Sequence, residues 1–362
     1  MKSSLKIFTI FGIPVELHIT FLLLIVIIFA LAFINILTYY AAFILVLLFV
    51  TVVIHELSHS YLAKRYGVPV ERIILLPIGG VSAMGEIPKD PDKELKIAIA
   101  GPLTNIIIAI FCFIALIITG GIGSISINSF FITNSPNADI NLFLSNFLGI
   151  NLLLGVFNLL PAFPMDGGRV LRAFFARRMS YVKATKTAAT IGKQFAILMA
   201  IIGIFFNFIL ILVAIFIYIG ADQEYKVIMV SSMLEGITVK DIMTKEVATL
   251  NPDTEVKEAL NKMFQKRHMG YPVIDEDNLV GIITFDDISR IPENKRNIPL
   301  KDIMSKKLII ASPDEPVFDS FEKITRNNIG RLPVCDKGKL VGIISKTDIM
   351  QALQMIESKS SP

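Results

Sequence analysis

The sequence places two histidines and a glutamate in the order H-E-x-x-H, as His55, Glu56 and His59. On a helix, residues i and i+4 share one face, so the two imidazoles can bind one tetrahedral zinc ion. Glu56 then lies beside the metal, where a carboxylate can accept a proton from zinc-activated water. Histidine pairs at this spacing also occur as plain surface or core residues. However, residues 41–54 before them carry no charge, and ionisable groups near membrane depth are costly and usually functional. This context favours a metal site.

Asp166 is the candidate for a third ligand, because catalytic zinc usually takes three protein ligands and one water. It is the only acidic residue between Asp139 and Asp222. It follows Pro161 and Pro164, which must bend or end a helix. An aspartate at such a place can also serve only as a helix-end or turn residue. No other residue of the apolar region competes for the role of third ligand.

The elements that must position these residues are predicted to be membrane helices. The chain has 362 residues, a mean hydropathy of +0.64, 53% hydrophobic residues and 18% charged residues, which is too apolar for an average soluble protein. Apolar stretches of about the 20 residues that cross a bilayer predict spans over 19–38, 41–65, 97–119, 142–160 and within 188–220. The last stretch fits one very long helix or a pair of shorter ones. We therefore expect a polytopic α-helical membrane protein with about six transmembrane helices.

The distribution of charge predicts the orientation of these spans. Lys and Arg lie in the loops after the second and fourth spans, and the opposite loops hold none. With Lys2 and Lys6 at the start of the chain, this pattern predicts a multi-pass cell-membrane protein, embedded in the lipid bilayer, whose N-terminus and tail are cytoplasmic. The basic residues form no groove with interleaved aromatics, so nucleic acid is not an expected partner. Cys112 and Cys335 fall in different regions and predict neither a disulfide framework nor a metal site, and we expect no cleaved signal peptide.

Residues 68–88 break the helical pattern with short β-prone pieces and glycines, including Gly79, Gly80 and Gly85. They predict strands or a hairpin. Open strand edges are not tolerated against lipid, so this segment must lie at the interface or line a cavity. A free edge beside a hydrolytic site can bind an extended peptide by strand addition. The alternative is an ordinary surface hairpin.

The run GPLTN, residues 101–105, lies near the start of the third predicted span. Small and amide residues in membrane helices allow close helix packing. The alternative is a direct role in the metal site. The sequence leaves both possibilities open.

The part after the apolar region has the composition of a soluble α/β domain, and it contains an internal repeat. Segments recur at an offset of 61 residues without a gap, for example Asp241-Ile242-Met243 as Asp302-Ile303-Met304 and Gly281-Ile282-Ile283 as Gly342-Ile343-Ile344. Such self-similarity indicates two copies of one structural unit, each with a helix, two short strands and a final helix. We expect a membrane domain over 1–222, a linker over 223–237, and repeat units over 238–297 and 298–356.

Two families are similar to these parts. The membrane part, about residues 5 to 222, resembles the site-2 protease family of intramembrane zinc metalloproteases, on the motifs HELSH, GPLTN and NLLPAFPMDGG. Met165 stands where that family usually has Leu, a change of similar volume from which we expect no effect. The resemblance implies that His55, His59 and Asp166 are zinc ligands and that Glu56 is the general base. It further implies that Asn158 lines the site and that Gly79 and Gly80 help to hold the substrate strand. It also implies substrates that are membrane-spanning proteins, cleaved by regulated intramembrane proteolysis.

The tail, about residues 238 to 355, resembles a pair of cystathionine-β-synthase (CBS) domains. The family pattern G-h-h-[ST]-x-x-D occurs twice, as Gly281, Thr284 and Asp287, and as Gly342, Ser345 and Asp348. In that family the hydroxyl can touch phosphate and the aspartate can bind ribose, which implies ATP, ADP or AMP as a ligand. The same residues could equally cap the helix that follows each of them. CBS pairs often assemble with one another, so a homodimer through the tail is possible.

The combined interpretation is an intramembrane zinc metallopeptidase, with nucleotide binding in the tail as a hypothetical control of access to the site. The alternative is a metal or ion transporter with CBS domains as its sensor. Glu56 separates the two, because a transporter needs ligands but no general base. The sequence does not identify the substrate or show whether an earlier cleavage must come first.

Overall fold

The computed structural model describes residues 4–77, 79–85, 88–131, 135 and 138–360. It divides into two compact units, residues 1–228 and 229–362. Lys2, which entered the orientation argument, and Ile78, Glu86 and Ile87 of the expected hairpin lie outside the described residues.

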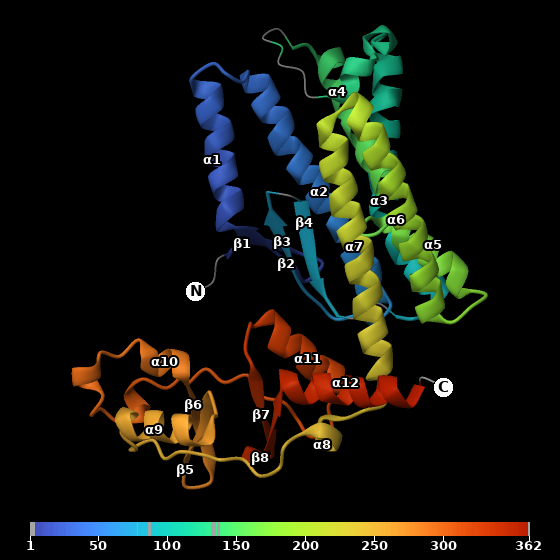
Figure 1. Cartoon of the computed structure of the whole chain (residues 1–362). Helices are drawn as coiled ribbons and strands as arrows, with labels where there is room; N and C mark the ends of the chain where they lie inside the picture. Colours follow the sequence, from blue (N-terminus) through green and yellow to red (C-terminus); the bar gives the residue numbers. More distant parts are fainter. Residues whose placement is uncertain (1–3, 78, 86–87, 132–134, 136–137, 361–362) are drawn as a thin grey trace. The chain divides into compact units, whose positions relative to one another are not determined.

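The first unit is built on long apolar helices (Figure 1). Five helices in the described part of the chain are long and apolar enough to cross a membrane: α2 (Tyr39–Arg65), α3 (Pro91–Ile118), α4 (Ile140–Asn158), α6 (Tyr181–Phe206) and α7 (Phe208–Met233). A further apolar helix, α1 (Ile19–Phe33), has 15 residues. At 1.5 Å per residue it extends about 22 Å, less than the hydrocarbon thickness of about 30 Å. The expected polytopic helical architecture is confirmed, with five helices of spanning length in the described residues where about six were expected.

The stretch 188–220 forms two helices and not one. Helix α6 ends at Phe206 and α7 begins at Phe208, so the chain reverses at Asn207 (Figure 1). Asn207 has an extended backbone, and its side-chain oxygen accepts a hydrogen bond from the backbone N–H of Ile209. This bond satisfies one of the amide groups that a helix start leaves without a partner.

A four-stranded sheet lies beside the helices, in the order β1-β2-β3-β4. Its strands are β1 (Ser4–Ile10), β2 (Ile13–His18), β3 (Val70–Leu76) and β4 (Gly79–Met84). The predicted hairpin is present as β3 and β4, which pair in antiparallel fashion. Strand β2 joins it in parallel, and β4 forms one edge of the sheet. The sheet packs on α2 through a small apolar core that includes Ile13, Val15, Val53 and Ile73.

The segment between α4 and α6 forms a bend followed by the short helix α5 (Asp166–Ala176). Two adjacent glycines allow this fold. A Cβ on Gly167 would lie 2.1 Å from the carbonyl oxygen of Leu160, and one on Gly168 would lie 2.6 Å from the nitrogen of Phe163. The first turn of α5 therefore packs directly on the backbone of the bend. Asp166 is the first residue of that turn.

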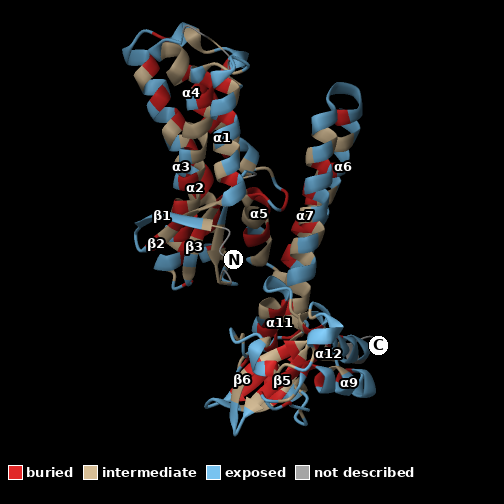
Figure 2. Cartoon of the chain, turned by 90° about the vertical axis from the view of Figure 1, so that its left-hand side faces the viewer, coloured by how far each residue is buried: buried red, intermediate tan, exposed pale blue. Residues whose placement is uncertain are grey.

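The second unit is the soluble α/β tail, with a sheet in the order β5-β6-β8-β7. Hairpin β5 (Gly270–Asp275) and β6 (Asn278–Thr284) joins hairpin β7 (Arg331–Asp336) and β8 (Lys339–Ser345) through a bridge between Asn278 and Lys339. The larger helices are α9 (Val256–Lys266), α11 (Val317–Arg326) and α12 (Lys346–Ser360), and the shorter ones are α8 (Val239–Ile242) and α10 (Phe285–Ser289). Figure 2 shows buried residues on strands β5 and β6 of this sheet.

The tail's two halves match in detail. Each hairpin has a register shift at the equivalent place, between Val273 and Ile274 and between Val334 and Cys335. Lys339 donates to Asp277 across the join, and this hydrogen bond holds the pKa of the Asp277 carboxyl below its usual range. The expected repeat of a helix, two strands and a final helix is thus present twice.

Candidate metal centre

Helix α2 presents the two histidines of the H-E-x-x-H pattern to the interior of the first unit. His55 and His59 lie one turn apart on the same face and are both buried. Their Nε2 atoms lie 3.1 Å from each other. The helical spacing therefore brings together two potential nitrogen ligands, as predicted.

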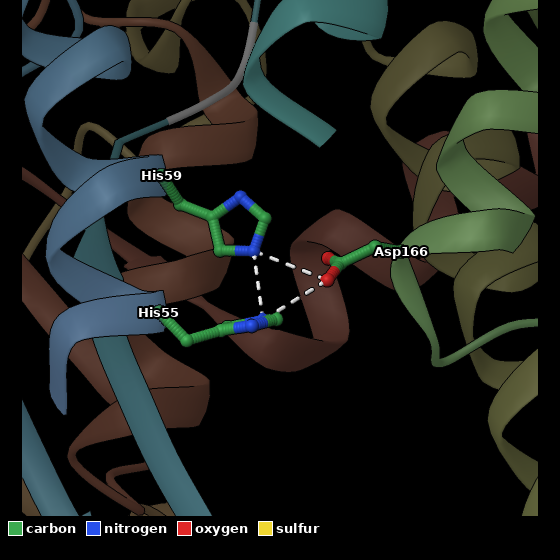
Figure 3. Close-up of side chains that lie close together, drawn as sticks. All are labelled: His55, His59 and Asp166. Carbon is green, nitrogen blue, oxygen red and sulfur yellow. Dashed lines mark hydrogen bonds and ion pairs between the residues drawn. The ribbon is translucent and has the colours of Figure 1, made fainter. Parts of the chain in front are cut away.

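Asp166 reaches the same point from α5 (Figure 3). Its Oδ2 lies 3.2 Å from Nε2 of His55 and 3.1 Å from Nε2 of His59. More than a hundred residues of sequence separate the aspartate from either histidine, and the bend after α4 closes that gap. The three predicted ligand residues thus form one cluster.

The hydrogen bonds behind the imidazoles show how their protons are distributed. His59 Nδ1 lies 2.6 Å from the backbone carbonyl of Ile97, an atom that can only accept. His55 Nδ1 lies 2.6 Å from Oδ1 of Asn105, whose amide nitrogen donates to Asn151. Both Nδ1 atoms are therefore donors, and in a neutral imidazole Nε2 then carries a lone pair. These tautomers are inferred from the hydrogen-bond partners of the two Nδ1 atoms.

Three lone pairs that converge within 3.2 Å repel one another unless a cation lies between them. A tetrahedral zinc ion with bonds of about 2.0–2.1 Å holds its ligand atoms about 3.3 Å apart, close to the observed separations. The donor set of two imidazoles and one carboxylate is one that catalytic zinc uses. The residues present therefore fit a zinc ion, and a fourth position remains for water.

Gly101 of α3 is required by the closeness of that helix to the histidines. A Cβ at this position would lie 2.2 Å from Nε2 of His59 and 2.5 Å from Nε2 of His55. The GPLTN run therefore has a direct place in the site, since Gly101 leaves room for the ligand atoms and Asn105 orients His55. The sequence left open whether this run only packs helices or takes part in the metal site, and the structure favours a part in the metal site.

Glu56 lies next to His55 on α2, and its side chain meets strand β4. Ser82 Oγ donates to Glu56 Oε2 at 2.7 Å. A Cβ on Gly80 would lie 2.6 Å from Cγ of Glu56, so only glycine allows β4 to come this close to α2. Gly79 adjoins it with a backbone φ of 134°, a conformation that favours glycine. The hairpin expected from the sequence therefore lies beside the candidate general base.

Asn158 is the last residue of α4, and its amide donates to the carbonyl of Leu154 in its own helix at 3.0 Å. The resemblance had implied that this side chain lines the site. In this structure its side chain bonds to the helix backbone, so its role in the site stays a prediction.

A buried ion cluster fixes the helix that carries Asp166. Arg172 of α5 is 2% exposed, and its Nε donates to Glu94 Oε1 and its Nη1 to Glu224 Oε1, each at 2.7 Å. The guanidinium also lies 5.0 Å from the ring centre of Phe163 and 4.9 Å from that of Tyr181. These contacts join α5 to α3, α6 and α7. Sequence reasoning did not identify this cluster.

In the tail, the four predicted nucleotide-binding residues form two capping boxes. Thr284 Oγ1 donates to Asp287 Oδ2 at 2.6 Å, and Ser345 Oγ donates to Asp348 Oδ2 at 2.7 Å. Each aspartate N–H in turn donates to the hydroxyl. The structural role that the sequence left open is therefore present.

Ser345 and Asp348 also line a pocket of the tail. The pocket offers basic, acidic and hydroxyl groups from both repeat units, among them Thr244, Glu246, His268 and Arg331. Thr284 and Asp287 are not among its lining residues.

Comparison with known proteins shows which families the two parts of the chain match. Residues 42–133 and 118–199 match the model of Peptidase family M50, and residues 239–294 and 300–355 match that of the CBS domain. A zinc metalloprotease of Methanocaldococcus jannaschii is 43% identical over 360 residues, which cover 99% of this chain and 98% of the relative. The solved structure of a site-2 protease from the same organism is 49% identical, covers 61% of this chain and 95% of its own, and has a TM-score of 0.43. An inosine-5'-monophosphate dehydrogenase of that organism is 37% identical over 113 residues, 31% of this chain and 22% of the enzyme.

Proposed function

This chain belongs to peptidase family M50, the site-2 zinc metalloproteases, and carries a pair of CBS domains; from that premise we propose that it cleaves membrane-spanning proteins within the bilayer, as a step of regulated intramembrane proteolysis. The convergence of His55, His59 and Asp166 around the space that Gly101 leaves open is the observation that carries the proposal. The family's zinc chemistry also sets aside the transporter alternative.

His55, His59 and Asp166 would hold one zinc ion, with Asn105 and the Ile97 carbonyl fixing the two imidazoles. Zinc held there supplies Lewis-acid chemistry, which acidifies water and polarises a peptide carbonyl. Glu56 accepts the proton of the attacking water at its carboxylate and then donates it to the leaving amine.

Strand β4 is the proposed docking element for the substrate. A membrane-spanning helix already satisfies its own backbone hydrogen bonds, so it must unwind before a peptide carbonyl can reach the site. The unwound segment can regain partners by pairing with the edge of β4, beside Gly79 and Gly80. The position of Gly80 against Glu56 supports this docking, because a peptide on that strand lies next to the base.

We infer a multi-pass protein of the cell membrane whose N-terminus and tail are cytoplasmic. The absence of Lys and Arg from the predicted outer loops of the sequence supports this orientation. Single-cysteine labelling from each side of the membrane, on a variant without Cys112 and Cys335, would test it. Labelling of a tail cysteine from outside intact cells would contradict the orientation.

The test of the protease proposal is cleavage of a model single-span substrate by the purified wild type and the Glu56→Gln variant, with zinc measured on both. We expect cleavage by the wild type alone and about one zinc per chain in each. Cleavage by Glu56→Gln at the wild-type rate would contradict the role of Glu56. Zinc bound by both with cleavage by neither, over a panel of single-span substrates, would contradict the protease proposal.

For the tail, we propose binding of an adenine nucleotide in the pocket that holds Ser345 and Asp348, with an effect on access to the metal site. Arg331 offers a donor for phosphate and Asp348 an acceptor for ribose. Titration of ATP, ADP and AMP by calorimetry should give binding that Asp348→Ala weakens more than Asp287→Ala does. An unchanged cleavage rate at saturating nucleotide would contradict the control of access.

A homodimer through the tail also belongs to this proposal. Phe264, Met269 and Met355 of the tail are each more than half exposed, so their apolar side chains are accessible to a second copy. Mass measurement of the full chain in detergent, with Phe264→Glu as the comparison, would test this assembly. A monomeric wild type would contradict it.

A further inference from the structure

The carboxylate of Glu56 is the end of a chain of hydrogen bonds that runs from α2 to β4 and back. Ser60 Oγ lies 3.1 Å from Ser82 Oγ, and Ser82 Oγ lies 2.7 Å from Glu56 Oε2. An ionised carboxylate only accepts, so Ser82 uses its one hydroxyl proton on Glu56. Ser60 must therefore donate to Ser82, and the order of donors is Ser60, Ser82, Glu56.

The geometry of the two elements makes this chain of bonds a fixed feature. Ser60 lies one helical turn after Glu56 on the same face of α2, and it is completely buried. Ser82 pairs with Ile73 in the β3–β4 hairpin, which fixes its position along α2. Gly80 has no Cβ that would push β4 away from Glu56. Both neighbours of the carboxylate thus come from backbone segments that are themselves held in place.

We propose that Ser82 is a positioning residue for the general base, and this inference rests on the proposed function of Glu56. With Oε2 held by Ser82, the other carboxylate oxygen, Oε1, is left for the attacking water. A free glutamate side chain must lose rotamer freedom to reach one productive geometry, whereas this one is restricted in advance.

Strand β4 then has two tasks in the reaction. Its edge would pair with the unwound substrate, and its Ser82 side chain holds the base. Because Ser82 and the docking edge belong to the same strand, a shift of β4 would move the substrate and the contact that orients Glu56 of α2 together. A displacement of about 1 Å between reacting groups can cost on the order of 10²-fold in rate.

The first test compares Ser82→Ala, Ser82→Thr and Ser60→Ala with the wild type in cleavage of a single-span substrate. Ser82→Ala should lower kcat on the order of 10- to 10²-fold with KM nearly unchanged. Ser82→Thr keeps a hydroxyl and suits a strand, so it should recover most of the rate. Ser60→Ala leaves the bond between Ser82 and Glu56 in place and should cost less than Ser82→Ala.

Two measurements separate positioning from a general structural role. Zinc content, and affinity for an uncleaved substrate measured in the Glu56→Gln background, should not change when Ser82 becomes Ala. In the Glu56→Asp background, where the shortened carboxylate no longer meets Ser82, the substitution Ser82→Ala should cost little or nothing further. An equal fold-loss of rate from Ser82→Ala in the wild type and in the Glu56→Asp background would overturn the inference, since residues that act through one another are not additive.

The outcomes also distinguish this inference from the proposed function. A wild type that cleaves, with Ser82→Ala equal to it in kcat, overturns the role of Ser82 and leaves the protease intact. Loss of zinc or of substrate affinity in Ser82→Ala also overturns it, in favour of a structural role. A wild type that binds zinc but cleaves no single-span substrate overturns both, because there is then no base to position.

Discussion

Substitution of Gly101 by alanine tests how closely α3 must approach the zinc ligands. The added Cβ would lie 2.2 Å from Nε2 of His59 and 2.5 Å from Nε2 of His55, whereas ordinary contacts begin near 3.4 Å. Relief of this overlap requires a displacement of about 1 Å of either the helix or the imidazoles. Zinc–ligand bonds tolerate only about 0.2 Å. The imidazoles cannot move that far and still bind the metal in the same geometry.

We therefore expect Gly101→Ala to weaken zinc binding by more than about 100-fold, beyond the usual effect of changing a residue behind a ligand, and to abolish cleavage. The assay is competition for zinc with a chromophoric chelator, followed by metal analysis of the purified protein. Gly123→Ala is the matched control, because a Cβ there meets nothing within 4 Å. Full zinc content and normal activity in Gly101→Ala would refute the reasoning, since α3 could then yield without disturbing the ligands.

Three further predictions concern other residues around the metal centre and the metal itself. Asn105→Ala removes the acceptor of the His55 Nδ1 proton and should lower zinc affinity about 10- to 100-fold, measured by the same competition, with no effect expected from Asn207→Ala. Arg172→Met leaves the buried Glu94 carboxylate without its guanidinium partner and should cost about 3–5 kcal/mol of stability, measured as a lower Tm. An unchanged Tm would mean that the cluster does not hold α5. Removal of zinc by a chelator should lower the Tm of the wild type, because the metal binds only the folded site, but should not change the Tm of Asp166→Ala.

The sequence was sufficient to single out the three candidate ligands that meet in the structure, because their signals are local. The H-E-x-x-H spacing places His55 and His59 on one helix face wherever that helix lies. Asp166 was identified because it is the only acidic residue of a long apolar region and follows two prolines. The ion cluster of Arg172, Glu94 and Glu224 had no comparable signal, since it depends on three helices meeting.

Strands β1 and β2 were not predicted, although the hairpin at β3 and β4 was. Apolar and polar residues alternate in β2 (IPVELH), but in β1 (SLKIFTI) the adjacent Ile7 and Phe8 interrupt the alternation that identifies a half-buried strand. The two-residue turn between these strands uses Phe11 and Gly12, both with positive φ, whereas asparagine or aspartate usually precedes the glycine in such turns. The turn therefore has the backbone conformation of a tight hairpin, but not the residue types by which such a turn is usually identified.

Gly101 and Ser82 act through distances that no local pattern encodes. The sequence allowed GPLTN to be either a packing element or part of the site, and only the contact of Gly101 with both histidines favours the second. Ser82 lies in an unremarkable strand sequence, and its bond to Glu56 depends on how close Gly80 brings β4 to α2. Long-range approach of this kind requires the folded chain.

The most direct test of the central claim is X-ray absorption spectroscopy at the zinc edge of the purified full chain, with metal content measured on the same sample. We expect about one zinc per chain, with nitrogen and oxygen ligands at about 2.0–2.1 Å, two of them imidazoles. In Asp166→Ala the zinc content should fall sharply. Sulfur ligands, or zinc kept in full when both histidines and Asp166 are replaced by alanine, would contradict the assignment of the metal centre.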